Sequence, residues 1–204
     1  IDARAEIDNA TAVRSQCTLV RQALADQTTL TSLPGSLLYS TQVDPENYRI
    51  YSVPAAAGSS AEAVIADGRQ PAHSPRDSLV AFRSTRPDVV GIAGFDLAAD
   101  NDPSSRSILY TRGVGDAVDS PPSWNGSGDH LVYATVDPAD QRSRVYTVAA
   151  DGRDTPRLLG PGLSPAWNPV DGSIVYNGVG PDGLQPGLWL IGSDGSGATR
   201  LTNS

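Results

Sequence analysis

Short apolar runs recur along the chain, and each run ends in an aromatic residue. In three copies a proline stands eleven residues before that aromatic residue, as the pairs Pro71 and Phe82, Pro122 and Tyr133, and Pro165 and Tyr176. When the same spacing is extended toward the N-terminus, residues 35–39 form a fourth copy of the apolar run, and Tyr39 is its aromatic residue. Self-similarity with a period of about 40 to 50 residues is typical of propellers and solenoids.

A second aromatic residue follows the first by 12 or 13 positions in every copy. These residues are Tyr51, Phe95, Tyr146 and Trp189. Turn dipeptides follow the last three of them, at 100–101, 151–152 and 194–195, and Asp-Gly pairs favour the type I′ turn of a hairpin. A further apolar run then begins at Val64, Leu158 and Leu201. Each unit therefore predicts four strands in meander order, which we name A, B, C and D.

The predicted fold is an all-β propeller of four-stranded antiparallel blades, preceded by one N-terminal helix. Four blades are expected near residues 27–66, 67–113, 114–160 and 161–203 of a domain that spans 27–204. Stacking of one blade on the next would bury the recurring aromatic positions, which favours a propeller over a sandwich. The predicted core positions are Tyr39, Phe82, Trp124, Tyr133, Trp167, Tyr176 and Trp189.

Residues 1–26 differ in character from the repeats. Their apolar positions fall three or four residues apart, which predicts one amphipathic helix. These positions are Ile7, Ala10, Val13, Cys17, Val20 and Leu24. This helix could pack against the propeller, or it could serve as a linker or dimerising helix. Because the chain begins with Ile1 and contains no Met, we expect a processed form or a part of a longer protein.

Charge and composition narrow the classes of partner. With 15 basic and 23 acidic residues the net charge is -8, which disfavours binding to nucleic acid. No apolar run approaches the ~18 residues of a membrane span, so direct membrane insertion is not expected. A single cysteine, Cys17, allows no internal disulfide.

The last unit carries a motif that resembles the TolB-type propeller repeat. It reads Pro-x-Trp-Asn-Pro-x-Asp-Gly-x-Ile-x-Tyr over residues 165–176 and is followed by Asp-Gly at 194–195 and Arg-Leu-Thr at 200–202. Earlier units depart from it, with Gly126 in the place of Pro169, His73 in the place of Trp and Ser78 in the place of Gly. The motif is structural and carries no catalytic residue.

The resemblance implies a bacterial protein that is periplasmic or extracellular. Its implied roles are binding of envelope partners, sensing on a receptor, or a non-catalytic propeller attached to a peptidase. Propellers of this type usually close with six or more blades. Three possibilities follow: further blades outside these residues, a second chain that completes the ring, or closure of the four blades alone.

The B-to-C loops vary in length, whereas the A-to-B and C-to-D turns are short and similar. Since binding residues are concentrated on loops of a rigid scaffold, we expect the end with the B-to-C and D-to-A loops to contact a partner. Neutral drift in surface loops is the alternative explanation of the variation. The predicted partner-binding residues are Asp44, Asp119, Asp137, Arg142 and Asp182.

Neither a cofactor nor a metal is expected. The two histidines and Cys17 lie far apart, with His73 expected in the core and His130 expected to be solvated. The acidic loops lack the calcium-loop pattern, and no Gly-x-Ser-x-Gly elbow occurs. The sequence therefore predicts a non-catalytic protein-binding, scaffolding or ligand-sensing module. An accessory propeller of a larger hydrolase or peptidase is the alternative.

Overall fold

The computed structural model describes residues 32–45, 47–86, 91–98, 111–112, 117–118, 120–137, 139–152, 154–179 and 185–202. These residues form strands and turns and contain no helix, so the all-β prediction is confirmed for them. The helix predicted at 1–26 lies outside this part of the chain. The chain divides into two compact units, one of Ile1–Leu37 and Val53–Ser60, the other of Leu38–Ser52 and Ala61–Ser204. All side-chain contacts discussed below lie within the second unit.

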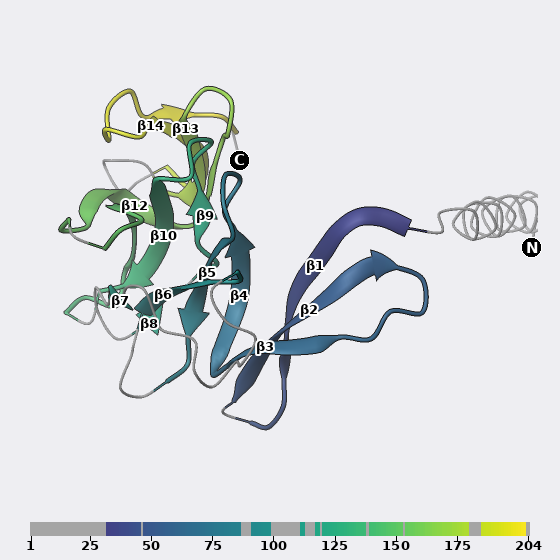
Figure 1. Ribbon diagram of the computed structural model, residues 1–204. Coiled ribbons are helices and arrows are strands. Elements are labelled where there is room, and N and C mark those ends of the chain that lie inside the picture. The colour runs from purple at the N-terminus through teal and green to yellow at the C-terminus, as the bar shows by residue number, and fades with distance from the viewer. Residues whose placement is uncertain are drawn as a thin grey trace, which may run out of the picture. The chain divides into compact units, whose positions relative to one another are not determined.

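The strands are found where the sequence pattern predicts them in the later units, whereas the first unit shows three strands in the part of the chain that the structure describes (Figure 1). Their bounds are β1 (Ser32–Gln42), β2 (Tyr48–Ala56), β3 (Glu62–Ala66), β4 (Gly68–His73), β5 (Leu79–Ser84), β6 (Gly91–Asp96), β7 (Thr111–Arg112), β8 (Ala117–Val118), β9 (Ser123–Trp124), β10 (His130–Val136), β11 (Ser143–Ala149), β12 (Arg157–Trp167), β13 (Ser173–Gly178), β14 (Gly187–Gly192) and β15 (Thr199–Arg200).

Hydrogen bonding joins these strands into sheets of sequential antiparallel neighbours. Sheet one has the order β1-β2-β3 and sheet two has the order β4-β5-β6-β7. The remaining strands form a path β15-β14-β13-β12-β11-β10-β8, and β9 also pairs with β10. Within β12, Arg157 to Pro161 pair with β11, whereas Gly162 to Trp167 pair with β13. We therefore divide the path at residue 161 into sheet three and sheet four.

A bulge recurs where strand A begins. The register shifts between Arg69 and Ala72 in β4, and between Leu163 and Ala166 in β12. In both places the residue before the proline, Gln70 or Ser164, has a positive φ. An extra residue at such a point bends the strand and increases its twist. The bulge thus precedes the proline, and the position held by His73 or Trp167 two residues later, in the same way in two repeats.

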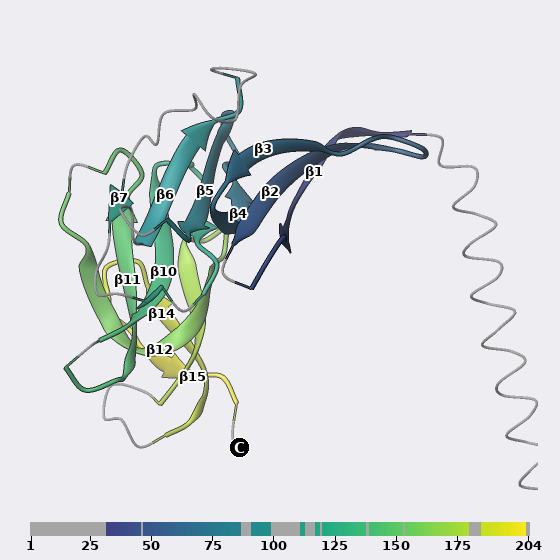
Figure 2. The ribbon, with the colours of Figure 1, turned by 90° about the horizontal axis from the view of Figure 1, so that it is seen from below.

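Successive sheets bury their apolar side chains against each other in three clusters. Between sheets one and two, Ile50 and Ile65 pack with Phe82 and Phe95. Between sheets two and three, Ala81 and Ile92 pack with Trp124, Leu131 and Tyr133. Between sheets three and four, Val132, Ala134 and Val145 pack with Trp167, Ile174, Tyr176, Trp189 and Ile191. The strands that carry these side chains lie close together in Figure 2. Removal of this apolar area from water is the main force that holds the sheets face to face.

Two expected core positions differ from the prediction. Tyr39 is 41% exposed, whereas its counterparts Phe82, Tyr133 and Tyr176 are buried. In each cluster the aromatic face of a sheet packs on the sheet that precedes it, and no described sheet precedes sheet one. His73 is exposed as well, with its Nδ1 2.6 Å from the carbonyl oxygen of Ser74. The imidazole is shorter than the indole of Trp124 or Trp167 in the same slot and turns toward its own backbone.

Candidate functional site

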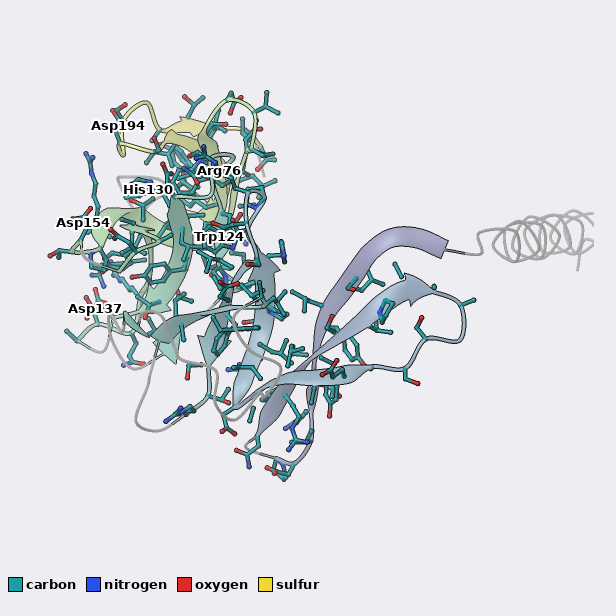
Figure 3. The ribbon with its side chains drawn as sticks, in the orientation of Figure 1. Arg76, Trp124, His130, Asp137, Asp154 and Asp194 are labelled. Atoms are coloured by element: carbon teal, nitrogen blue, oxygen red, sulfur yellow. The ribbon has the colours of Figure 1, made fainter. Side chains whose placement is uncertain are left out.

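The two ends of the sheets carry different kinds of connection. In sheet three, the A-to-B turn at 125–129 and the described C-to-D residues, 150–152 and 154–156, lie at one end, and the described B-to-C residues, 137 and 139–142, lie at the other. Figure 3 shows Asp137 well separated from His130 and Asp154. We call these the turn end and the loop end.

At the loop end, Asp137 is held by its own sheet. Its Oδ2 lies 2.6 Å from Nη1 of Arg144, and Arg144 also binds Asp140 at 2.7 Å. The hydrogen bonds from Arg144 lower the pKa of Asp140. Arg142 is exposed, and its backbone carbonyl accepts a hydrogen bond from the Asp137 amide. The structure therefore brings Asp137 and Arg142 together in one loop. The carboxylate of Asp137 is paired with Arg144, a neighbour that sequence reasoning missed and that Asp137 shares with Asp140.

The structure says less about a binding role for the other three predicted residues, Asp44, Asp119 and Asp182. Asp44 accepts hydrogen bonds from the backbone and side chain of Asn47, which is a local turn arrangement. Asp119 and Asp182 lie outside the described residues. The five predicted residues are thus not assembled into one described site.

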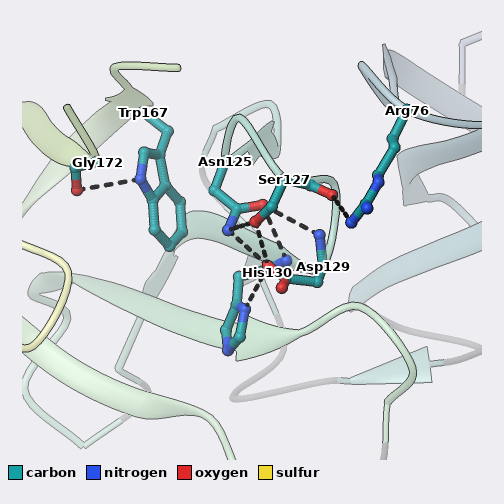
Figure 4. Close-up of polar contacts among 7 residues, drawn as sticks. All are labelled: Arg76, Asn125, Ser127, Asp129, His130, Trp167 and Gly172. Atoms are coloured by element: carbon teal, nitrogen blue, oxygen red, sulfur yellow. Dashed lines mark hydrogen bonds and ion pairs between the residues drawn. The ribbon is translucent and has the colours of Figure 1, made fainter. Parts of the chain in front are cut away.

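At the turn end, four residues of sheet three form a hydrogen-bonded cluster (Figure 4). Oδ1 of Asp129 accepts from Nδ2 of Asn125 at 2.6 Å and from Oγ of Ser127 at 2.8 Å. Nδ1 of His130 lies 2.8 Å from the same oxygen. The side-chain oxygen of Asn125 in turn accepts from the backbone amides of Asp129 and His130. We name Asn125, Ser127, Asp129 and His130 the turn cluster.

The turn cluster keeps one carboxylate ionised. The hydrogen bond with His130, followed by those from Asn125 and Ser127, holds the pKa of Asp129 well below its ordinary value. The Asp129 side chain nevertheless stays 60% exposed, and that of His130 46% exposed. Asp129 is therefore both fixed in position and open to a further donor.

Neighbouring sheets complete the surroundings of the cluster. Nη1 of Arg76 in sheet two donates to the carbonyl oxygen of Ser127 at 3.2 Å. The His130 ring lies 6.4 Å from the Trp167 ring of sheet four, centroid to centroid. A Cβ at Gly126 would overlap the carbonyl oxygen of Pro169, so this turn approaches sheet four as closely as glycine allows. These contacts fix the turn relative to the sheets on both sides.

Two cavities open beside the cluster, and Asp129 and His130 line both of them. One, of about 470 Å³, lies toward sheet four and is also bounded by Val148, Asp154, Arg157 and Trp167. The other, of about 570 Å³, lies toward sheet two and is also bounded by Leu79 and Ala150. Both volumes are in the range of small-molecule or side-chain pockets. A rigid carboxylate next to apolar walls can recognise a cationic or amide group joined to an apolar body.

The arrangement of the cluster does not match a hydrolytic triad. In a triad, histidine stands between the serine and the carboxylate and takes the serine proton. Here Asp129 stands between Ser127 and His130. Across the described residues, no group of three or more His, Cys, Asp or Glu side chains could hold a metal ion. The described part of the chain also contains no helix long and apolar enough to cross a membrane.

Sequence reasoning placed the candidate face at the loop end and missed the turn cluster. One signal was present, because Asp129 and His130 occupy the repeat slots that hold Gly172 and Ser173 in sheet four. These residues are a local departure from the structural motif. Their partners in sheets two and four, however, could not be read from spacing alone.

Comparison with solved structures gives the fold. TolB from Acinetobacter baumannii matches with a TM-score of 0.61 and 15% identity over 82% of this chain and 41% of that one. A putative TolB from Agrobacterium tumefaciens matches with a TM-score of 0.56 and 20% identity over 83% and 63% of the two chains. An oligogalacturonate lyase from Vibrio parahaemolyticus matches with a TM-score of 0.59 and 14% identity over 81% and 48%.

No protein-family model and no curated protein matches the sequence. The chain spans about two fifths to two thirds of the length of these structural neighbours. At such identities the likeness concerns the fold alone. The chain has the fold of a β-propeller and resembles the TolB-type propellers.

Proposed function

We propose that this chain is a non-catalytic, TolB-like binding module that recognises another protein or a peptide through the turn cluster. We further propose that it works in the bacterial periplasm or outside the cell, as the fold resemblance favours. The net charge of -8 favours a partner segment with cationic groups over nucleic acid.

The observation that supports this proposal is the fixed and exposed carboxylate of Asp129. Three side chains of the same turn orient it, and it borders two cavities. A group already held in its binding position loses little conformational freedom when a ligand arrives. A lysine, arginine or backbone amide of a peptide could therefore donate to Asp129 at small entropic cost.

The cavity toward sheet four adds selectivity to this carboxylate. Val148 and Trp167 supply apolar surface, while Asp154 and Arg157 supply charges of opposite sign. We infer that the preferred peptide carries a cationic residue next to an apolar one. A strongly acidic peptide would meet Asp129 and Asp154 and be disfavoured.

The test uses an array of short peptides that pair lysine or arginine with an apolar residue, alongside acidic and scrambled peptides. Binding is followed by titration calorimetry and by the indole NMR signal of Trp167. Asp129→Asn should weaken binding of selected peptides about tenfold or more, because a charged acceptor becomes neutral. Asp77→Asn, a change at an exposed carboxylate in the A-to-B turn of sheet two, is the matched control and should bind as wild type. Equal affinity of Asp129→Asn and wild type for all peptides would reject the turn cluster as the site.

We propose the loop end as a second binding surface, because its loops vary in length from one unit to the next. It would use Asp44, Asp119, Asp137, Arg142 and Asp182. Charge reversal at Asp137 and Asp182 together should weaken a partner that binds there and leave peptide binding at the turn cluster unchanged. Unchanged affinity for every partner would exclude the loop end.

The alternative function is an accessory propeller that positions substrate for a catalytic domain of a larger hydrolase or peptidase. The fold is also shared by an oligogalacturonate lyase whose structure contains manganese. An assay of this chain with oligogalacturonate and with peptides, each with and without Mn²⁺, separates the cases. We expect no turnover of either substrate. If the wild-type chain did turn over a substrate, and Asp129→Asn or another single substitution abolished that activity, the chain would be an enzyme.

A further inference from the structure

The three clusters between sheets share one construction. Each sheet packs an aromatic face on the aliphatic face of the sheet before it. Sheet four, for example, places Tyr176 and Trp189 on Val132 and Val145 of sheet three. An aliphatic face of this kind is thus built to receive the aromatic face of a following sheet.

Sheet four carries a related face on its outer side, in which Asn177 stands at the position of Ala134. Sheets three and four are related by an offset of 43 residues, which takes Trp124 to Trp167, and the same offset takes Val132 to Val175 and Val145 to Leu188. Leu188 lies opposite Asn177, and Asn177 lies opposite Leu163, so the three form one row across the sheet. Leu188 is 43% exposed and Leu163 39%. Within the described residues, this receiving face is uncovered.

Sheet one carries the complementary aromatic face. Tyr39 stacks on Tyr51 with ring centroids 5.6 Å apart, and Tyr133 stacks on Tyr146 in the same way at 6.0 Å. The Tyr133 pair is packed into the cluster on sheet two, with Tyr133 fully buried, whereas Tyr39 is 41% exposed. Sheet one therefore holds an assembled aromatic pair, and no aliphatic face from the described part of the chain lies against it in the way seen for the other pairs.

We propose that the aromatic face of sheet one docks on the outer face of sheet four in a second copy of this chain. Both faces are exposed in one copy, so they do not cover each other there. Two different faces that fit each other form a heterologous interface, and such interfaces close when the rotation permits. Two copies of four sheets would make a ring of eight, within the usual range of propellers. This inference is independent of the turn cluster.

Self-association tests the proposal directly. Wild-type chain should be a dimer by light scattering and sedimentation at about 100 µM and should dissociate on dilution. Leu188→Asp and Tyr39→Asp should each convert the closed dimer into a much weaker species, since each removes one of the two faces. Leu163→Asp is a second variant on the receiving face. Val170→Asp is the matched control, because Val170 is 91% exposed on a turn outside both faces, and this variant should remain dimeric.

A mixing experiment identifies the faces. Leu188→Asp retains the aromatic face and Tyr39→Asp retains the aliphatic face. An equimolar mixture should therefore form a one-to-one complex at concentrations where neither variant associates alone, with circular dichroism confirming that both are folded. A monomeric wild type at about 100 µM, association unaffected by Leu188→Asp, or a mixture that stays dissociated would each overturn the proposal.

Discussion

At the scale of single residues, two positions in the turn of sheet three differ from sheet four in ways that shape the turn cluster. Asp129 stands where Gly172 stands in sheet four, and Gly126 stands where Pro169 stands. Three local side chains orient the aspartate, whose charge lies one position later than that of Asp171 in sheet four, and the glycine lets the turn approach Pro169. These two differences set the position of the carboxylate and bring the turn close to sheet four.

The depressed pKa of Asp129 gives a pH-dependent contribution to stability. Its folded pKa is lower than its unfolded value of about 3.9, so the stabilisation is fully present above that value and is lost as the pH falls through the folded pKa. Asp129→Asn should lower the free energy of unfolding at pH 7 by less than about 1 kcal/mol, because the carboxylate is largely exposed. Urea unfolding of both proteins from pH 7 downward checks this. A difference that widens below pH about 4 would contradict the assignment.

Gly126→Ala should destabilise the protein by about 1 to 3 kcal/mol, because the new methyl group would overlap the backbone of Pro169. Denaturant unfolding measures the change. Gly160→Ala is the control, since its Cβ would meet only the Tyr176 hydroxyl at an ordinary 3.9 Å. Equal stability of the two variants would show that the turn and sheet four are not in close contact.

At the scale of elements, β12 explains how one strand serves two sheets. Its first half is strand D of sheet three and its second half is strand A of sheet four. The bulge at Ser164 redirects the chain between Leu163 and Ala166, and Trp167 follows in the buried slot. Nε1 of Trp167 donates to Gly172 and its backbone amide donates to Ser123 of sheet three. The end of β12 thus fastens sheet four to sheet three.

Trp167→Ala should cost about 3 to 5 kcal/mol, because it leaves a large cavity in the cluster between sheets three and four. Thermal or urea unfolding measures the loss. Trp167→Phe keeps most of the apolar volume and should recover part of the stability. A loss below about 1 kcal/mol for the alanine variant would mean that this slot is not core.

At the scale of the whole molecule, strands that occupy equivalent places in the repeat differ in whether neighbouring sheets cover both of their faces. The strands β10 and β13 are both B strands with hydrogen-bonded neighbours on either side. Residues Leu131 to Thr135 of β10 are buried on both faces, whereas Val175 and Asn177 of β13 face outward with partial or full exposure. Local stability follows such burial.

Amide hydrogen exchange should therefore be at least about tenfold slower in β10 than in β13. The measurement uses Leu188→Asp, in which the outer face of sheet four stays uncovered. Equal protection of the two strands would show that the sheets unfold as one unit irrespective of coverage. In wild-type chain, protection of β13 should rise with protein concentration.

Most of the fold could be predicted because strand periodicity and turn residues are local properties. The meander order of the strands, the buried positions of Phe82, Tyr133 and Tyr176, and the TolB resemblance all follow from spacing. A fourth strand of the first unit, expected near residue 30, lies outside the described residues. The exposure of Tyr39 could not be predicted from the same spacing, because a position is buried only if another sheet covers it. The exposure of His73 follows from an imidazole that turns to the Ser74 carbonyl, which the spacing does not show either. The turn cluster could not be predicted for a similar reason, since short turns give no sign of the cavities that form between them, and the binding role expected for the loop end stays a prediction.

The sequence alone determined the alternation of apolar and polar positions, and with it which side chains can face a neighbouring sheet. Only the tertiary structure decided which of those faces are covered, and which residues of neighbouring sheets border the turn cluster: Arg76 of sheet two at Ser127, and Trp167 of sheet four beside His130. The physical reason is that periodicity acts within a few residues of the chain, whereas burial and contacts between sheets depend on the approach of segments that are distant in sequence.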